Sequence, residues 1–156
     1  KISQELKSAF ERICAVDALM QEATVPGKTL GDVFEKCIEA YKQMGFPENE
    51  WYNHHQGGAT GYAGRTCKGK PGEEFPVLDT YYPSLLKNEL GNNIPFGTAF
   101  AWNPSAKGVK SEDTFILYPN GIKEIVTLTE EIQFVDLEKL LKRSINIRKS
   151  GIYIEK

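Results

Sequence analysis

Apolar side chains recur at helical spacing through the first third of the chain. Between residues 2 and 22 they fall every three or four positions, and the run ends at the helix breakers of segment 26–27. A second apolar stripe follows Thr29, which can cap a helix together with Asp32 three residues later. Gly45 can then supply the left-handed residue that ends this helix. The pattern predicts two antiparallel helices joined by a short loop.

After residue 50 the pattern becomes typical of strands and loops. Segment 50–77 is rich in glycine and aromatic residues and lacks helical periodicity. The clearest prediction is a hairpin, in which residues 111–118 and 122–129 flank an Asn120-Gly121 turn. Shorter elements are predicted as a helix or turn at 83–93, a strand at 98–102, a helix at 136–143 and a strand at 151–156. Because helices come first and antiparallel strands follow, the predicted fold class is α+β.

Composition limits the classes of protein that remain. At 156 residues the chain is long enough for a single domain with a substantial core. A formal charge of −2 argues against nucleic acid as a partner, and no apolar run reaches the roughly 18 residues that span a bilayer. We therefore expect a cytoplasmic protein that binds neither nucleic acid nor membrane. Since the first residue is Lys1, we also expect these residues to be a piece of a longer or processed chain.

The three cysteines carry little information about chemistry. Cys14 and Cys37 fall on the apolar stripes of the predicted helices, whereas Cys67 lies in a predicted loop. The number is odd and no Cys-x-x-Cys pair is present, so free reduced thiols are expected. A metal site built from His54, His55 and Cys67 would lack a fourth ligand and a recognised spacing.

The stretch HHQGGATGYAGRT, residues 54–66, is the strongest candidate for chemistry. His54 and His55 are imidazoles, which titrate near neutral pH and serve as general acids or bases. On a strand the two side chains would alternate, so at most one would face a pocket. The glycines that follow form no phosphate loop, because no GxxxxGK[ST] motif is present. The alternative interpretation is a histidine hydrogen-bonded in a sheet, beside glycines that permit close backbone packing.

Four segments, in this order, resemble one known family. They are a VPGKT junction between two helices, the His/Gly-rich stretch, GTAFAWNPS at 97–105 and GVKSEDTFILYPNGIKEIVTLT at 108–129. Over residues 2–130 they are similar to the C-terminal half of the creatinase/aminopeptidase, or pita-bread, family, which includes prolidase and Xaa-Pro aminopeptidase. The resemblance implies half of a pita-bread fold, with two N-terminal helices on a curved antiparallel sheet. It also implies that residues 1–156 form one domain, the C-terminal part of a catalytic domain whose N-terminal half is absent.

The family holds two divalent metal ions with two aspartates, one histidine and two glutamates. In this chain the histidine of its Gly-His-Gly motif is replaced by Gly58, and its first glutamate is replaced by Asn103. Its second glutamate is matched by Glu112, which the resemblance places inward, and the two aspartates belong to the half without a counterpart here. A glycine has no donor atom and a neutral amide offsets no charge, so no metal cofactor is expected. This segment alone is therefore not expected to act as a metallopeptidase.

Other candidate site residues are contacts to a substrate. His54 stands where prolyl-specific members carry a histidine near the substrate, so it is the candidate acid–base catalyst, with His55 beside it as a binding residue. Arg65 replaces a second such histidine, and Lys110 stands where an arginine is common. These two cations can clamp a ligand carboxylate. Arg65 could equally be an ordinary surface cation, and the Asn-Pro pair at 103–104 could simply form a turn.

The most specific functional prediction is a Xaa-Pro aminopeptidase-like or prolidase-like domain without dinuclear metal catalysis. Such a pseudoenzyme would bind a peptide or small molecule, with Asn103 and Glu112 among its contacts. The alternative is a true hydrolase of a small amide- or proline-containing substrate, either metal-independent or completed by a partner. That partner would be the absent N-terminal half or a second copy that pairs through an exposed sheet edge as a homodimer. A non-catalytic interaction module is a third interpretation.

Overall fold

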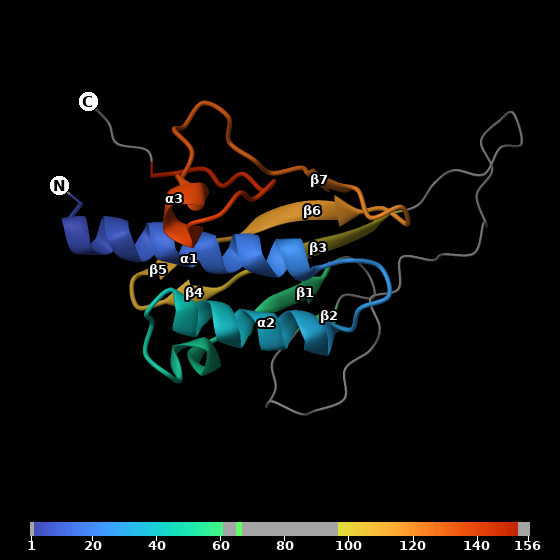
Figure 1. The fold of residues 1–156 in the computed structure, drawn as a ribbon, viewed down its shortest axis with the longest axis horizontal. Helices are drawn as coiled ribbons and strands as arrows, with labels where there is room; N and C mark the ends of the chain where they lie inside the picture. The colour runs from blue at the N-terminus through green and yellow to red at the C-terminus, as the bar shows by residue number, and fades with distance from the viewer. Residues whose placement is uncertain (1, 61–64, 67–96, 153–156) are drawn as a thin grey trace, which may run out of the picture.

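The computed structural model describes residues 2–60, 65–66 and 97–152. Its helices are α1 (Gln4–Ala23), α2 (Leu30–Gln43), the 3-10 helix η1 (Glu50–Asn53) and α3 (Leu137–Leu141). Its strands are β1 (Gly57–Ala59), β2 (Arg65–Thr66), β3 (Thr98–Trp102), β4 (Ser105–Ala106), β5 (Val109–Lys110), β6 (Asp113–Leu117) and β7 (Lys123–Ile125). Figure 1 shows these helices together with the antiparallel sheet, which confirms the predicted α+β class. Within the described ranges, no helix is long and apolar enough to cross a membrane.

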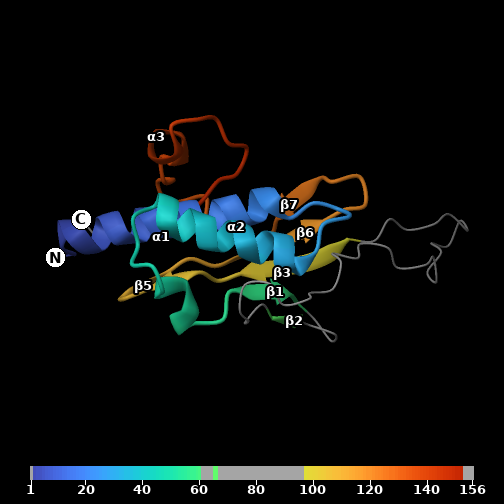
Figure 2. The same cartoon turned by 60° about the horizontal axis from the view of Figure 1, so that its bottom comes forward.

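Both predicted N-terminal helices are present, and local signals set the ends of α2. The Asp32 N–H donates to Thr29 Oγ1 at 3.0 Å, and the Thr29 N–H donates to Asp32 Oδ2 at 2.6 Å. This reciprocal capping box satisfies two backbone donors that the helix itself leaves unpaired. Gly45 follows the helix with φ of 70°, a left-handed conformation that glycine adopts without strain. Figure 2 shows α1 and α2 side by side in one layer, with the sheet in the other.

The strands form a five-stranded sheet in the order β2-β1-β3-β6-β7, with β3 at its centre. All the pairings are antiparallel, and Phe100 of β3 lies opposite Phe115 of β6. β6 and β7 make the predicted hairpin around the Asn-Gly turn, but only 113–117 and 123–125 are strand, so the hairpin is shorter than predicted. β4 and β5 pair with each other as a separate short hairpin. Antiparallel neighbours joined by short turns explain why the strand predictions from local pattern were largely correct.

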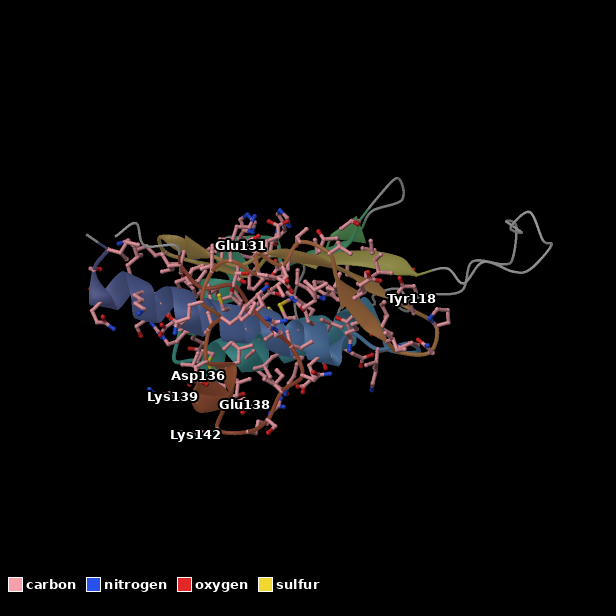
Figure 3. All side chains as sticks on the ribbon, turned by 90° about the horizontal axis from the view of Figure 1, so that it is seen from above. Tyr118, Glu131, Asp136, Glu138, Lys139 and Lys142 are labelled. Carbon is pink, nitrogen blue, oxygen red and sulfur yellow. The ribbon has the colours of Figure 1, made fainter. Side chains whose placement is uncertain are left out.

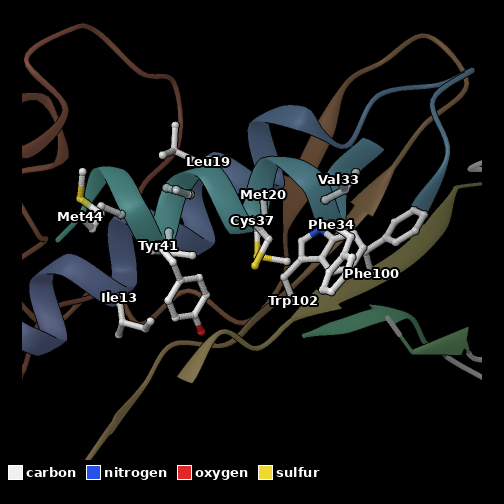
Figure 4. Packing of buried hydrophobic residues seen from close by; sticks show 14 of the residues in the cluster. Ile13, Leu19, Met20, Val33, Phe34, Cys37, Tyr41, Met44, Phe100 and Trp102 are labelled. Carbon is white, nitrogen blue, oxygen red and sulfur yellow. The ribbon is translucent and has the colours of Figure 1, made fainter. Parts of the chain in front are cut away.

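The core lies between the helix layer and the sheet. The ring centroids of Phe100 and Trp102 are 6.0 Å apart, and those of Phe100 and Phe115 are 5.8 Å apart. Figure 4 shows Phe34 of α2 grouped with Phe100 and Trp102 at this interface. Full burial of such side chains contributes roughly 1.5–3 kcal/mol each. The helices and the sheet therefore share one hydrophobic core.

Two segments differ from the prediction. Residues 50–53 form η1 instead of strand or loop, and Trp51 Nε1 donates back to Glu48 O at 2.9 Å within this turn. Residues 151–152 are not in a strand, and the rest of that predicted strand lies outside the described residues. The helix or turn predicted at 83–93 also lies outside them. Single turns such as η1 escape periodicity arguments, because they are too short to show a repeat.

After β7 the chain returns to the helix layer. The predicted short helix is present as α3, which packs against α1, and Asp136 caps it by accepting the Lys139 N–H at 3.1 Å. Figure 3 shows both of these charged side chains at the margin of the molecule. Residues 142–152, which we call the C-terminal segment, then run back beside residues 133–135. The Val135 N–H donates to the carbonyl oxygen of Lys149 at 2.9 Å.

Candidate functional site

The side chains of β6 alternate between the two faces of the sheet. Asp113, Phe115 and Leu117 are buried on the face that packs against the helices. Glu112 and Thr114 therefore belong to the opposite face, since successive residues of a strand point to opposite sides.

The strand register extends this opposite face across the sheet. Gly58 lies opposite Ala101, and Ala101 lies opposite Thr114. Asn103 follows Ala101 by two residues and Glu112 precedes Thr114 by two. Both lie one residue beyond their strands, and we assign them to the same face by continuing the alternation. We call this set of five residues the outer face. It contains all three positions at which the family resemblance expects metal ligands.

Asn103 and Glu112 lie opposite each other, just beyond the ends of β3 and β6. The antiparallel pairing continues past the strand ends, because the Ser111 N–H donates to Pro104 O at 3.1 Å. On its other side the Asn103 N–H donates to Gln56 O, also at 3.1 Å, so the backbone here is held by both neighbours. The backbone ladder thus gives the outer face a rigid base.

Asn103 carries an unsatisfied acceptor. The residue is 6% exposed, and its Oδ1 atom is buried without a hydrogen-bond donor among the residues that the structure describes. A buried carbonyl oxygen without a partner costs about 1–3 kcal/mol. Such an atom accepts a hydrogen bond only from an N–H or O–H group that reaches it inside the protein.

Glu112 is half-exposed rather than enclosed. Its Oε2 lies 2.7 Å from Lys110 Nζ, and the two side chains are 44% and 45% exposed. The inward position expected of Glu112 is not observed, because the carboxylate that turns toward the core is that of Asp113, which is 8% exposed. An exposed ion pair of this kind is worth only about 0–1 kcal/mol, so a ligand can displace Lys110 at little cost.

His54 and His55 lie together in the turn between η1 and β1. The prediction that they alternate along a strand is wrong: their rings stack, with centroids 4.3 Å apart and planes at 28°. His54 Nδ1 lies 2.5 Å from the His55 carbonyl oxygen, which can only accept, so Nδ1 carries a proton. In the neutral form of this ring, Nε2 has the lone pair. His55 Nδ1 accepts the Gly57 N–H at 3.4 Å.

Hydrogen bonds from the buried Gln56 hold the turn that contains the two histidines. Gln56 is buried, and its Nε2 donates to Trp51 O at 2.7 Å and to His54 O at 3.0 Å. Gly57 has φ of 86°, and a Cβ there would lie 2.1 Å from Ala101 O. Only glycine fits both this conformation and this approach. Gly57 therefore permits close backbone packing, which was the plainer of the two interpretations, whereas Gly61 and Gly64 lie outside the described residues.

Arg65 is placed only through its backbone. It lies in β2, opposite Ala59 of β1, while its side chain lies outside the described residues. Cys67 also lies outside them. Contacts of Arg65 with a ligand therefore stay a prediction.

The donor atoms of the outer face do not fit a pair of metal ions. Gly58 offers no side-chain donor, Asn103 offers one neutral oxygen, and Glu112 is shared with an ammonium group. Within residues 2–60 and 97–152, no group of three or more His, Cys, Asp or Glu is arranged to hold a metal. Two divalent ions would need several carboxylates or imidazoles around them.

Sequence reasoning missed a buried charged cluster directly behind the outer face. Lys149 Nζ donates to Oδ2 of both Asp17 and Asp113. Lys149 is 1% exposed, Asp17 0% and Asp113 8%. The available signal was Asp17, a lone carboxylate within the apolar run 15–20. Nothing near Lys149 in the sequence indicated burial.

Burial sets the ionisation of this cluster and of the thiol next to it. Burial alone would lower the pKa of Lys149, but the charges of Asp17 and Asp113 outweigh it and raise that pKa, so the ammonium form is favoured. Burial raises the pKa of Asp17, with the Lys149 charge acting against it. Burial likewise raises the pKa of Cys14 to about 12. Cys14 and Cys37 are buried thiols outside any disulfide, as predicted, and the raised pKa of Cys14 favours its neutral thiol form.

We compared the chain with known proteins in three ways. A scan against models of protein families, a search of curated proteins and a search of solved structures each found no match.

Proposed function

We propose that this chain is half of a pita-bread fold, with a curved sheet, whose outer face binds a peptide or small molecule without a pair of metal ions. In this proposal it is a pseudoenzyme of the Xaa-Pro aminopeptidase or prolidase type, working in the cytoplasm. One observation carries the proposal. The register pairs Gly58 with Ala101, and continuing it past the strand ends assigns Asn103 and Glu112 to the same face. At these positions the family would carry metal ligands, whereas Gly58 has no donor atom, Asn103 has an amide and Glu112 supplies a single carboxylate.

The outer face favours a ligand that carries an amino group. Asn103 Oδ1 is an acceptor without a donor among the described residues, and Glu112, one residue before β6, carries a half-exposed carboxylate. Two acceptors from neighbouring segments match an ammonium group, which has three N–H donors, once that group reaches the buried Asn103 oxygen. The free amino terminus of a short peptide supplies that group and can replace Lys110 as the partner of Glu112.

Calorimetry with a proline-containing peptide tests this binding. We expect Ala-Pro-Ala to bind and its N-acetylated form to bind at least about tenfold more weakly, since acetylation removes the charge and two of the donors. Asn103→Leu and Glu112→Gln should each weaken binding of the free peptide by about tenfold. Glu35→Gln is the matched control, because it removes one exposed carboxylate from α2, in the other layer. Equal binding of the free and acetylated peptides would overturn the assignment.

Titration with Mn²⁺ tests the absence of a dinuclear centre. We expect no saturable heat at tens of micromolar protein, because the donor set is too small to compensate two divalent charges. Two stoichiometric sites of micromolar or tighter affinity would refute the proposal. A Glu112→Gln variant then shows whether the outer face holds the ions, since it would abolish at least one of them.

A metal-independent hydrolase is the second candidate, and the tautomer of His54 favours it. Its Nε2 lone pair, set by the contact of Nδ1 with the His55 carbonyl oxygen, is what a general base requires. Hydrolysis of an Xaa-Pro dipeptide in the presence of a metal chelator tests it. Turnover that is lost in His54→Gln would support the hydrolase, whereas binding without turnover would leave the pseudoenzyme.

The fold also has an edge that a partner can complete. β7 ends the sheet and pairs only with β6 among the described strands, and Val126 just after it is 50% exposed. We propose that a second copy, or the missing N-terminal half, pairs along a free edge. Light scattering should show a dimer at tens of micromolar, and a clean monomer would count against the second copy.

A further inference from the structure

Three charged side chains from distant parts of the chain meet between α1 and the sheet. Asp17 comes from α1, Asp113 from the start of β6, and Lys149 from the C-terminal segment. The lysine is fully buried and donates to both carboxylates. A buried ammonium group is tolerated only with such partners, so the cluster forms only when the C-terminal segment is docked.

Further hydrogen bonds satisfy the remaining carboxylate oxygens. Asp17 accepts from Ser111 Oγ at 2.8 Å and from Gln21 Nε2 at 3.0 Å. Asp113 Oδ1 accepts from Thr127 Oγ1 at 3.1 Å. Each carboxylate oxygen thus has a donor, and loss of the lysine would leave two buried negative charges facing each other.

The cluster holds the backbone on both sides of Glu112. Ser111 precedes Glu112 and is bound to Asp17, while Asp113 follows it and is bound to Lys149. Thr127 Oγ1 also accepts the Thr114 N–H at 2.8 Å, which joins the cluster to a second residue of the outer face. Residues 111–114 are therefore fixed from the helix side, although Glu112 itself points to the other side.

The C-terminal segment enters this arrangement chiefly through Lys149. Its neighbour Ser150 exchanges hydrogen bonds with the backbone of Thr129, at 3.0 and 2.9 Å, in an exposed position. Arg148 lies over the ring of Phe134, with its Cζ 3.9 Å from the centroid, also at the surface. Only the lysine of these three reaches the interior.

We propose that Lys149 is a positioning residue for the outer face. Its ammonium group, delivered by the docked C-terminal segment, holds residues 111–114 so that Glu112 lies opposite Asn103. Docking of the C-terminal segment therefore sets the ligand affinity of the outer face. The part of this inference that concerns ligand affinity rests on the function proposed above, whereas the coupling of the two segments stands on the buried contacts alone.

Hydrogen exchange measured by mass spectrometry tests the coupling without any ligand. Lys149→Met keeps the length of the side chain but removes its charge, and we expect exchange to rise at least about tenfold in both 110–116 and 145–152, with α2 unchanged. Lys149→Arg retains the charge and should restore most of the protection. Lys139→Met, at an exposed position of α3, is the control for loss of one cation. If Lys149→Met changes 145–152 and leaves 110–116 as before, the coupling is refuted.

A second variant keeps the test decisive if Lys149→Met does not fold. Asp113→Asn leaves the Lys149–Asp17 pair in place but removes the charge that attracts Lys149 to β6, so exchange should rise in 110–116 while 145–152 stays protected. Unchanged exchange in 110–116 would overturn the proposal.

Binding of Ala-Pro-Ala to the same variants separates the two proposals. We expect affinity to fall about tenfold in Asp113→Asn, in parallel with the exchange of 110–116. If exchange changes as expected but no variant binds the peptide, the coupling stands and the proposed function fails. If the peptide binds all folded variants equally, Lys149 does not position the outer face.

Discussion

The indole N–H of Trp102 donates to Thr24 Oγ1 at 2.8 Å inside the core, and both residues are fully buried. The Thr24 hydroxyl in turn donates to Met20 O at 2.7 Å, so it is oriented to accept from the indole. This bond joins the end of α1 to the central strand β3. At the residue scale, single polar contacts of this kind fix how the helix layer sits on the sheet.

Replacing Thr24 with valine should be costly because it leaves the Trp102 N–H buried without an acceptor. We expect a loss of about 1–3 kcal/mol in the free energy of unfolding, measured by urea denaturation. Thr60→Val, at an exposed threonine, serves as the control and should change stability by less than about 0.5 kcal/mol. Equal effects of the two substitutions would contradict the structural role of the bond.

Gly57 and Gly27 form a matched pair for testing the close approach of β1 to β3. Both have φ near 85°, but a Cβ at Gly27 meets nothing within 4 Å, whereas one at Gly57 would meet Ala101 O at 2.1 Å. Gly27→Ala should therefore cost only about 1–2 kcal/mol, for its left-handed backbone. Gly57→Ala should cost clearly more, because the strands must also separate. Similar urea midpoints for the two variants would show that the clash is relieved without loss of pairing.

At the scale of elements, the helices follow their local signals closely. The capping box predicted at Thr29 and Asp32 is present, and so is the left-handed glycine that ends α2. The strand at 98–102 is confirmed in full, because its alternation and its bounds are both local features. The hairpin is shorter than predicted, since β7 is an edge strand whose pairing depends on one neighbour only.

The capping box also predicts how α2 responds to acid. Hydrogen bonds from the Thr29 backbone and side chain lower the pKa of Asp32. A carboxylate whose pKa is lowered by folding adds stability above its unfolded pKa, and this contribution is lost as the pH falls through the folded pKa. We therefore expect the urea midpoint to fall as the pH drops below about 4. Asp32→Asn should flatten that dependence, whereas Glu35→Gln, outside the cap, should leave it unchanged.

At the scale of the whole molecule, two ion pairs tie the C-terminal segment to α1. Arg143 pairs with Glu22 at the surface, with side chains 44% and 41% exposed. Lys149 pairs with Asp17 in the interior. Solvent screens the first pair but not the second, so they should differ greatly in their effect on stability.

Substitution of each cation by methionine measures that difference. Arg143→Met should lower the free energy of unfolding by less than about 1 kcal/mol. Lys149→Met should lower it by about 3–5 kcal/mol, because it leaves buried carboxylates without a counter-charge. Thermal denaturation at low and at high salt provides the check, since only the small effect of Arg143 should fade with salt. A loss below about 1 kcal/mol for Lys149→Met would mean that the carboxylates are protonated or hydrated in its absence.

The candidate site was predictable only in part. Asn103, Glu112 and Lys110 were singled out from sequence motifs, and the first two lie one residue beyond the paired strands β3 and β6. The stacking of His54 on His55 was not foreseen, because it depends on η1 and on the conformation of Gly57. Strand alternation is a safe inference only where a strand exists.

The sequence by itself determined the elements whose causes lie within a few residues: the two helices with their caps, the central strand and the Asn-Gly hairpin. Only the tertiary structure decided which charges are buried. Asp17 and Lys149 are separated by more than a hundred residues, so no local pattern links them, and their pairing exists only because folding removes both from water. Local hydrogen bonds and periodicity depend on residues that are close in sequence. The cost of burying a charge depends instead on which distant group folding places beside it to compensate that charge.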